Sequence, residues 1–311
     1  MIKNPVLVIA GPTASGKSAL AAQAAHDLNG VVLNCDSMQI YKDIPIIAAA
    51  PTEEEKMLAE HRLFEIYDCD KRGNVVDWLN LCAAEIRKLW AEKRLPVVVG
   101  GTGFYVEALL NGVTPIPETP IEVREQLQAR INQEGLENLY KELQQKDAEI
   151  AAKLNPNDKT RIVRALEVIA ATGQKLSEWY KKPLIQKLPE AHFITVKIMP
   201  SLDVIATRCC LRLDKMVDEL GVLAEIEKLL NKGVDENMPA MKALGVPELS
   251  LFIKGQMLLP EALDLAKLHT RQYAKRQQTW LKNKMSADIV FENVYEGQKD
   301  YLQQIFNVIK L

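Results

Sequence analysis

The segment Gly11–Ser18, GPTASGKS, constrains the possible fold of this chain more than any other. It follows the apolar run Val6–Ala10 and precedes an Ala-rich segment of helical spacing, Ala19–Leu28. The pattern G-x-x-x-x-G-K-[ST] in that setting is typical of the phosphate loop, which joins a β-strand to an α-helix. Backbone N–H groups of such a loop, together with the helix N-terminus, attract phosphate oxygens. The sequence therefore predicts a polyphosphate-binding strand–loop–helix unit, whereas a glycine-rich turn without a ligand is the alternative.

Side chains of this loop add to the chemistry expected of it. Lys17 supplies a mobile positive charge, and the Ser18 hydroxyl is placed to hold a magnesium ion that bridges phosphate oxygens. Arg208 and Arg212, one helical turn apart, could reach a diphosphate from elsewhere in the chain. The loop residues expected to hold the phosphates are Gly11, Pro12, Thr13, Ala14, Ser15, Gly16, Lys17 and Ser18.

Apolar runs alternate with segments of helical spacing along much of the chain. Strands that alternate with helices favour a parallel sheet covered on both faces. The predicted fold class is therefore α/β, a parallel sheet of the P-loop NTPase type flanked by helices. Further strands are expected at Val31–Cys35, His61–Tyr67, Pro96–Val99, Phe193–Ile198 and Asp288–Phe291. Helices are expected at Asp77–Lys93 (with Asp77 as N-cap), at Leu202–Lys232 (one long helix or a pair) and at Pro260–Lys284.

The character of the sequence changes near Thr114, where the Pro-rich stretch PIPETP begins. From Ile121 to about Tyr180 the chain is polar, helical in spacing and poor in strands, which predicts a smaller all-helical insertion domain. The expected organisation is a first part of the catalytic core at 1–115, the insertion at 116–190 and the second part of the core at 191–311.

Composition argues against several classes of protein. The five cysteines form no C-x-x-C pair and the four histidines are scattered, so a disulfide framework and a zinc site are not expected. A net charge of −2 argues against extensive coating by nucleic acid but permits a local basic face. The sequence contains no recognisable signal peptide or membrane-spanning run. We expect a cytoplasmic monomer without membrane contact.

Asp36 ends the second apolar run, and ligands collect at the carboxyl ends of parallel strands. It could hold a metal ion, as in other phosphate-loop enzymes, or act as a general base toward an acceptor. A turn aspartate without a catalytic role is the third possibility. Its neighbours Ser37, Met38, Gln39 and Tyr41 offer hydrogen-bonding groups and a ring suited to a flat heterocycle.

Gly100–Tyr105, GGTGFY, is a second glycine-rich turn after an apolar run. Glycines allow a backbone to approach a ligand closely, and Thr102 can donate or accept a hydrogen bond there. Taken alone, this turn is a weak signal. Together with the phosphate loop, it predicts a pocket that holds phosphates at one wall and a polar acceptor at the other.

Lys267–Lys284 carries six Lys or Arg residues and no acidic residue. On a helix, Arg271, Lys275 and Lys282 fall close to one stripe. A solvated charged face is the usual explanation of such a run, whereas the absence of acids and the interleaved aromatic residues favour contact with a phosphate backbone. Thr160–Arg164 forms a second short basic patch.

In these motifs together the sequence resembles the tRNA dimethylallyltransferase family, the isopentenyl-transferring enzymes that modify an adenosine next to the anticodon. The resemblance covers nearly the entire chain, and the set is far more specific than a phosphate loop alone. The motifs that carry it are GPTASGKS, DSMQIY from Asp36, GGTGFYVEALLNG from Gly100, NPND and RIVRALEV within Asn155–Val168, RLDKM from Arg212 and TRQYAKRQQTW from Thr270.

The resemblance implies transfer of a dimethylallyl group from dimethylallyl diphosphate to the exocyclic N6 of adenosine 37 in tRNA. It implies that Asp36 takes or orients the N6 proton, that Thr102 contacts the target nucleotide, and that Arg212 adds charge to the departing diphosphate. The phosphate loop would hold the diphosphate with Mg²⁺. The residues implied to contact the tRNA anticodon stem-loop are Asp36, Ser37, Met38, Gln39, Thr102, Arg124, Thr160, Arg161, Ile162, Val163 and Arg164, to which the basic helix adds Arg271 and Lys275.

Two segments depart from the family pattern. Most members carry a G-T-A-[KR]-P-like element where this chain has Ile47–Pro51, and an aromatic-Lys pair where it has Val246-Pro247. Neither change touches the carboxylate or the phosphate loop, so we expect an active enzyme that binds tRNA more weakly. The chain also ends soon after its last expected strand, without the zinc finger of eukaryotic relatives, which implies a bacterial form.

Two other functions fit parts of the sequence. A small-molecule or nucleoside kinase would place ATP in the phosphate loop and use Asp36 as base or metal ligand. A non-catalytic nucleic-acid-binding module would use the loop only as a switch. Asp36→Ala distinguishes the transferase, which should lose turnover and keep tRNA binding, from a binding module, which has no activity to lose.

Overall fold

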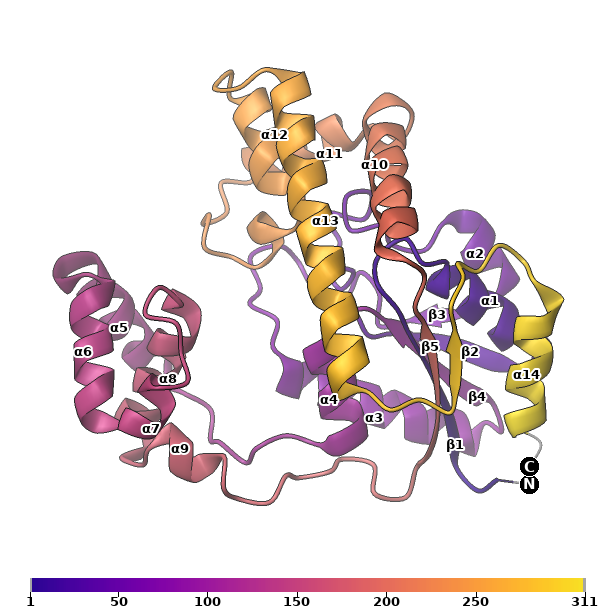
Figure 1. Ribbon diagram of the computed structural model, residues 1–311, viewed down its shortest axis with the longest axis horizontal. Coiled ribbons are helices and arrows are strands. Elements are labelled where there is room, and N and C mark those ends of the chain that lie inside the picture. Colours follow the sequence, from indigo (N-terminus) through magenta and orange to yellow (C-terminus); the bar gives the residue numbers. More distant parts are fainter. Residues whose placement is uncertain (1, 310–311) are drawn as a thin grey trace. The chain divides into compact units, whose positions relative to one another are not determined.

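Residues 2–309 of the protein are described by a computed structural model, and a six-stranded parallel β-sheet forms the centre of its larger unit (Figure 1). The strands lie in the order β3-β2-β4-β1-β5-β6, and every pair is parallel. The predicted parallel sheet flanked by helices is confirmed. The strands are β1 (Pro5–Ala10), β2 (Gly30–Asn34), β3 (His61–Arg62), β4 (Leu95–Gly100), β5 (His192–Ile198) and β6 (Ile289–Phe291).

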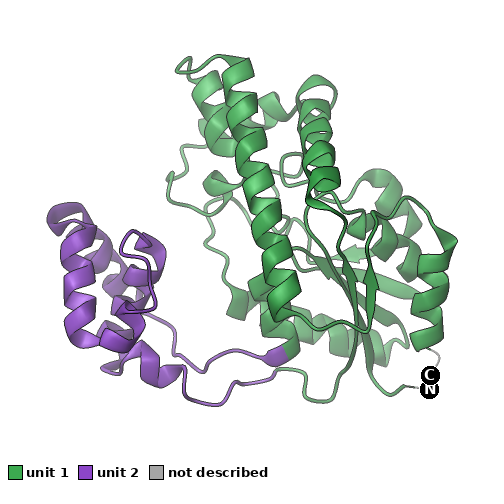
Figure 2. Ribbon diagram, viewed as in Figure 1, with its two compact units in different colours: residues 1–110, 187–311 green, residues 111–186 purple. Residues whose placement is uncertain are grey.

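The chain divides into two compact units (Figure 2). The larger comprises residues 1–110 and 187–311 and contains the sheet. Its helices are α1 (Lys17–Asp27), α2 (Glu53–Leu58), α3 (Val75–Ala91), α4 (Gly103–Asn111), α10 (Leu202–Asp218), α11 (Val222–Asn231), α12 (Val246–Ile253), α13 (Leu259–Lys284) and α14 (Lys299–Ile309), with a 3₁₀ turn at Ala240–Lys242. Among these, α13 lies beside α10 (Figure 1).

The smaller unit, residues 111–186, is helical and has its own apolar core. Leu139, Leu143, Ile162 and Leu166 are buried in this core. Such a core is what allows a polar, strand-poor segment to fold compactly. The helices are α5 (Ile121–Glu134), α6 (Leu136–Lys146), α7 (Ala148–Ala151), α8 (Lys159–Thr172) and α9 (Leu176–Trp179).

The central position of β1 determines where ligands can bind. β1 pairs with β4 on one side and with β5 on the other, and all its residues from Val6 to Ala10 are buried. Because the strands are parallel, the segments that follow β1, β2 and β4 emerge at the same edge of the sheet. Gly11, Asp36 and Thr102 lie in those segments.

Two local expectations were wrong, and one left open is now decided. The strand expected at His61–Tyr67 ends at Arg62, because Leu63 and Glu65 have left-handed φ angles of 67° and 52° that a strand cannot contain. Helix α3 is capped by Asn74, whose side chain accepts from the N–H groups of Val76 and Asp77, and not by Asp77 itself. The single or paired helix expected at 202–232 is a pair, α10 and α11.

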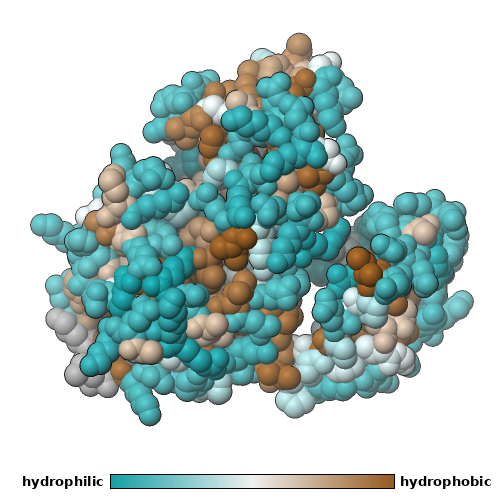
Figure 3. Space-filling model, turned by 180° about the vertical axis from the view of Figure 1, so that it is seen from behind, coloured by the Kyte–Doolittle hydropathy of each residue, from teal (hydrophilic) through white to brown (hydrophobic). Residues whose placement is uncertain are grey.

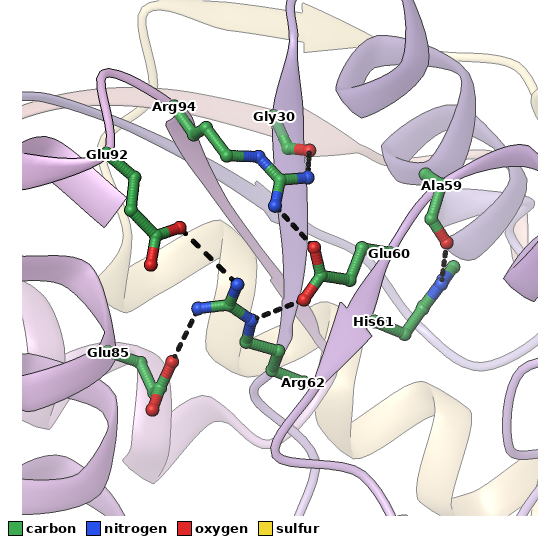
Figure 4. Close-up of polar contacts among 8 residues, drawn as sticks. All are labelled: Gly30, Ala59, Glu60, His61, Arg62, Glu85, Glu92 and Arg94. Atoms are coloured by element: carbon green, nitrogen blue, oxygen red, sulfur yellow. Dashed lines mark hydrogen bonds and ion pairs between the residues drawn. The ribbon is translucent and has the colours of Figure 1, made fainter. Parts of the chain in front are cut away.

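A cluster of ion pairs links β3 to α3 and to the segment that follows α3 (Figure 4). Arg62 pairs with Glu60 at 2.7 Å, with Glu85 of α3 at 2.9 Å and with Glu92 at 3.5 Å. Arg94 also pairs with Glu60 and donates to the carbonyl of Gly30 at 3.0 Å. Hydrogen bonding to Arg62, then to Arg94, lowers the pKa of Glu60. The stability contributed by Glu60 is therefore present at neutral pH and is lost as the pH falls through that lowered pKa.

Replacing Arg62 with Met should reduce the free energy of unfolding by about 1 to 3 kcal/mol, between the values typical of exposed and of buried ion pairs. The reason is that its side chain is only 19% exposed and serves three carboxylates. Urea denaturation measures this change. The matched control is Arg87→Met, whose half-exposed side chain pairs with Glu190 alone among carboxylates; an equal loss in both variants would contradict the expectation.

The surface carries mostly hydrophilic residues with small hydrophobic patches between them, as the face seen in Figure 3 shows. No helix formed by residues 2–309 combines the length and the hydrophobicity needed to cross a membrane.

Candidate active site

The phosphate loop lies between β1 and α1 and has the backbone geometry that its glycines were expected to allow. Gly16, the N-cap of α1, has φ 85°, and a Cβ placed on it would lie 2.3 Å from the carbonyl oxygen of Tyr295. A side chain is therefore excluded at Gly16 by conformation and by space. The segment around Tyr295 also donates its N–H to the carbonyl of Ser15 at 3.1 Å and so supports the loop from outside.

The side chains of Lys17 and Ser15 are buried within the loop. Lys17 Nζ donates to the carbonyl of Pro12 at 3.3 Å. Ser15 Oγ is fully buried and, among the residues described, is the buried side-chain oxygen left without a hydrogen-bond partner. It points toward Gly11, where a Cβ would lie 2.6 Å from it. Buried polar groups without partners are rare and mark places where a ligand or water belongs.

Burial lowers the pKa of Lys17 to about 8, an effect that Asp36 opposes and Arg212 strengthens. Removing the charged ammonium from water is unfavourable, and a neighbouring guanidinium adds repulsion. A bound diphosphate would reverse both effects, because its negative charge favours the protonated amine. The loop is thus electrostatically suited to a polyanion.

Arg212 and Arg208 of α10 reach the loop as the sequence suggested. Arg212 donates through Nη2 to the hydroxyl of Thr13, and Arg208 donates through Nε to the carbonyl of Ala14 at 2.9 Å. Arg208 also pairs with Glu296. Burial lowers the pKa of Arg212, but guanidinium stays charged at neutral pH. Arg212 therefore adds a second full positive charge, besides that of Lys17, next to the phosphate loop.

Asp36 is held in one position directly after β2. Its N–H donates to Oδ1 of the buried Asn34 at 2.8 Å, and its own Oδ1 accepts from the N–H of Met38 at 2.9 Å. Asn34 Nδ2 in turn donates to the carbonyls of Asp36 and Leu63, and the indole of Trp78 donates to the Asn34 carbonyl. Oδ1 of Asp36 thus has a backbone hydrogen-bond partner, whereas Oδ2 accepts no hydrogen bond from residues 2–309.

Thr102 lies next to this carboxylate segment. Its Oγ1 accepts from the N–H of Ser37 at 3.1 Å and lies 3.4 Å from the Ser37 hydroxyl. This contact is possible because Gly100 allows the two strand ends to approach: a Cβ there would lie 2.0 Å from the carbonyl oxygen of Cys35. Asp36, Ser37 and Thr102 therefore form one wall beside the phosphate loop.

The segment that follows Asp36 is held by two buried or half-buried polar side chains. Gln39 Nε2 donates to the carbonyls of Ala48 and Ala49 at 3.1 and 2.7 Å. Glu225 of α11 accepts the N–H groups of Ile46 and Ile47. Burial raises the pKa of Glu225, and these two N–H groups oppose the rise. In this protein Gln39 is thus engaged in shaping the loop whose sequence departs from the family pattern.

Three residues near the site were not identified from the sequence, although all lie in the motifs discussed. Burial raises the pKa of Tyr273, the charge of Asp36 raises it further, and hydrogen bonding to Thr102 and Gln277 opposes the rise. Gln277 is buried and bonds to Thr13 and Gly101. Phe104, beside Thr102 in sequence, is 61% exposed. The signal that could have found them is an uncharged residue inside the basic helix and an exposed aromatic in the glycine-rich turn.

The cations of α13 lie partly in a shallow surface groove of about 550 Å³. Lys275, Arg276, Lys284 and Trp280 line it, whereas Arg271 and Lys282 do not. The predicted stripe of Arg271, Lys275 and Lys282 is exposed, and the buried face of α13 contains Ala274 and Gln277.

The remaining predicted residues lie in the smaller unit. Arg124 is on α5, and Thr160, Arg161, Ile162, Val163 and Arg164 are in the first turns of α8. Arg161 is exposed and pairs with Asp158 at 3.4 Å; Arg164 donates to Thr119 at 2.8 Å and pairs with Glu167 at 3.3 Å. The side chain of Ile162 is fully buried in the core of this unit. Its place there is explained by packing.

The family can be assigned from a match along most of the chain. A family model described as IPP transferase matches residues 39–284. This chain belongs to the IPP transferase family. The match begins after the phosphate loop and Asp36, so these two features are observations independent of it, whereas Thr102 and Arg212 lie inside the matched range.

Curated relatives and solved structures agree with this assignment. The tRNA dimethylallyltransferase of Bradyrhizobium sp. (strain ORS 278) is 40% identical over 282 residues, 91% of each chain. That of Zymomonas mobilis is 39% identical over 299 residues, 94% of each chain. The crystal structure of the tRNA isopentenylpyrophosphate transferase from Bacillus halodurans has a TM-score of 0.68 and 32% identity, covering 99% of this chain and 96% of that one.

A structure of a eukaryotic dimethylallyltransferase acting on tRNA superposes with a TM-score of 0.80 at 27% identity. It covers 98% of this chain and 78% of that chain. This IPP transferase family member therefore shares its overall fold with these solved transferases.

Proposed function

We propose that this protein transfers the dimethylallyl group of dimethylallyl diphosphate to the exocyclic N6 of adenosine 37 in tRNA and releases diphosphate. The observation that carries the proposal is the placement of Asp36 and Thr102 beside a phosphate loop in which Lys17 is buried and within electrostatic reach of Asp36 and Arg212. The names of its relatives support the same reaction. They give no support to the kinase considered from the sequence.

On the donor side, the phosphate loop, Lys17 and Arg212 bind the diphosphate and stabilise the charge that develops as the C–O bond breaks. Preorganised cations and N–H groups in a site of low dielectric are the largest single source of such stabilisation. Three or more His, Cys, Asp or Glu side chains do not come together as a metal site anywhere in residues 2–309. Ser18, which directly follows Lys17, would be the side chain that holds Mg²⁺ next to the diphosphate, and Mg²⁺ readily accepts such a small number of protein ligands. Bound there, Mg²⁺ would neutralise the leaving group.

On the acceptor side, Asp36 takes the proton from N6 as the nitrogen attacks the allylic carbon. The new N–C bond forms while the C–O bond to the diphosphate breaks, so the proton ends on the carboxylate and the electron pair on the departing diphosphate. An aromatic amine is a weak nucleophile, which makes proton removal and positioning the main contributions of the protein. Thr102, fixed by Ser37, orients the target nucleotide.

Recognition of tRNA would use both units of the chain. The target base must leave its stack in the RNA to reach the carboxylate of Asp36, which follows the end of β2. The exposed cations of α13, Arg271 and Lys275, and the smaller unit with Arg124 and the segment Thr160–Arg164 are proposed to contact the anticodon arm. Phosphate contacts of this kind supply affinity that falls with salt.

The test is incubation of the purified protein with Mg²⁺, dimethylallyl diphosphate and an unmodified anticodon stem-loop that carries adenosine 3′ to the anticodon. Nucleoside mass spectrometry should find one added dimethylallyl group on that adenosine. A matched stem-loop with guanosine at the same position is the control. Absence of the product, together with ATP turnover on a small acceptor, would exclude the proposed function in favour of a kinase.

The loop at Ile47–Pro51 should weaken tRNA binding, because it lacks the basic side chain common at this place. Ala50→Lys is therefore expected to raise the affinity for the stem-loop by about 1 kcal/mol or less, as typical of one added exposed phosphate contact. Filter binding at two salt concentrations measures the affinity and its salt dependence. Ala50→Gln, of similar length and without charge, is the control, and an affinity unchanged by Ala50→Lys would refute the idea.

A further inference from the structure

Gln277 connects the two walls of the site through a single amide group. Its Oε1 accepts from the N–H of Thr13 in the phosphate loop at 2.9 Å, and its Nε2 donates to the carbonyl of Gly101 at 2.8 Å. Thr13 and Gly101 lie on different sides of the site, after β1 and after β4. The orientation of the amide follows from its partners, since an N–H can only donate and a carbonyl can only accept.

The Gln277 amide is closely packed at Gly101, and its partner Thr13 is held by a second hydrogen bond. A Cβ on Gly101 would lie 2.4 Å from Gln277 Nε2 and 3.0 Å from the carbonyl oxygen of Gly11. Because Gly101 has no side chain, the Gln277 amide can approach its backbone this closely. At the other end, Arg212 holds the hydroxyl of Thr13 while Gln277 holds its N–H. Thr13 is fixed through both its side chain and its backbone.

The helix that carries Gln277 is itself anchored along its length. Ala274 packs against Ile205 and Cys209 of α10. The ring of Trp280 lies against Gly103, where a Cβ would come within 2.4 Å of it. Lys197 of β5 donates to the carbonyl of Met285 at 2.7 Å, just beyond the helix end. The amide is therefore presented by a rigid element.

We propose that Gln277 is a positioning residue that fixes the distance between the diphosphate-binding loop and the acceptor turn. The inference rests on the proposed function and assigns to α13 a second role besides RNA contact. Displacement requires the acceptor nitrogen and the allylic carbon to be within about 3.5 Å and in line, and a misplacement of about 1 Å can lower a rate by about 100-fold. A residue that sets this spacing acts on the rate of the chemical step more than on the binding of either substrate.

Gln277→Met tests this with a side chain of similar size that can make neither hydrogen bond. We expect the single-turnover rate of dimethylallyl transfer to fall by about 10- to 100-fold. Affinities for inorganic pyrophosphate with Mg²⁺ and for the stem-loop should stay within about threefold. Gln278→Met is the matched control: Gln278 is the adjacent glutamine and donates to the carbonyl of Pro200, and its replacement should leave the rate within about threefold.

Gln277→Glu supplies a readout that a merely structural role would not produce. A protonated glutamic acid offers one acceptor and one O–H donor, like the glutamine, whereas an ionised one repels the carbonyl of Gly101. Burial raises the pKa of such a carboxyl, so the rate of Gln277→Glu relative to the unchanged protein should rise as the pH is lowered from about 8 to about 6. The ratio for Gln277→Met should stay flat. The other ionisable groups around the loop and the amide, which are Lys17, Asp36, Arg212 and Tyr273, are the same in all the proteins compared.

Three results would overturn the proposal. A Gln277→Met rate within threefold of the unchanged protein, by the same criterion as the control, would exclude a positioning role while leaving the proposed function intact. A loss of pyrophosphate affinity as large as the loss of rate would mean that Gln277 only maintains the loop. No transfer by the unchanged protein would refute the proposed function and this inference together.

Discussion

Replacing Asp36 with Asn is expected to lower the rate of dimethylallyl transfer by about 10²- to 10⁴-fold, the range that general bases contribute. Asn keeps the oxygen that accepts from the N–H of Met38 and leaves the hydrogen bond between the Asp36 N–H and Asn34 in place. The backbone of the acceptor wall should therefore stay in position, and only the ability to take a proton is lost. Single-turnover transfer to the stem-loop measures the rate.

Binding of the stem-loop by Asp36→Asn should remain within about threefold of the unchanged protein, because a binding residue and a base have different signatures in rate and affinity. Asp68→Asn is the control: Asp68 is an exposed carboxylate that pairs with Lys42 and takes no part in the site. A retained rate in Asp36→Asn would refute the role of general base. A lost rate with equally lost stem-loop binding would assign Asp36 to recognition instead.

Lys17→Met is expected to lower transfer by about 10²- to 10³-fold, as the loss of one preorganised group facing developing charge typically does. The affinity for inorganic pyrophosphate should fall with it, because the side chain contributes a full charge inside the loop. The unliganded variant should also unfold at a higher temperature than the unchanged protein. The reason is that Lys17 is only 9% exposed and its charge is disfavoured by burial, so an apolar side chain of similar length fits the empty loop better.

The pH dependence of binding gives a second test of the same residue. With a pKa of about 8, Lys17 is largely protonated at pH 7 and loses its proton as the pH rises through that value. Diphosphate binding favours the charged form, so binding above about pH 8 should take up a proton, and the affinity should fall with rising pH. Calorimetry in buffers of different ionisation enthalpy measures the uptake.

Lys17 also affects how the free energy of unfolding depends on pH. The sign of this effect is opposite to that of a lysine whose pKa is raised by an ionic partner. The pKa of Lys17 is lower in the folded protein than the 10.5 of an exposed lysine. The unfolded chain therefore binds more protons between about pH 8 and 10.5, and this residue's contribution to stability rises with pH in that range. Lys17→Arg is the control for both measurements, because guanidinium keeps its charge throughout. Proton uptake by Lys17→Arg equal to that of the unchanged protein would exclude Lys17 as its source.

The sequence by itself determined the fold class and the two walls of the site. Gly11–Ser18 could be interpreted because the spacing of its glycines, lysine and serine is typical of a phosphate-binding strand–loop–helix turn. In the structure Gly16 has the positive φ that other residues avoid. Asp36 and Thr102 follow apolar runs, and in a parallel sheet the ends of such runs meet at one edge. Local pattern and simple topology were sufficient for these residues.

Only the tertiary structure decided how the walls are joined and which elements α13 packs against. Gln277 contacts Thr13 across a separation of 264 residues, and no local pattern in the basic helix distinguishes it from Gln278. The partners of Ala274, which are Ile205 and Cys209 of α10, are likewise not specified by sequence spacing. Hydrogen bonds and packing between distant segments are set by the relative placement of whole elements, and helical or strand periodicity carries no information about that placement.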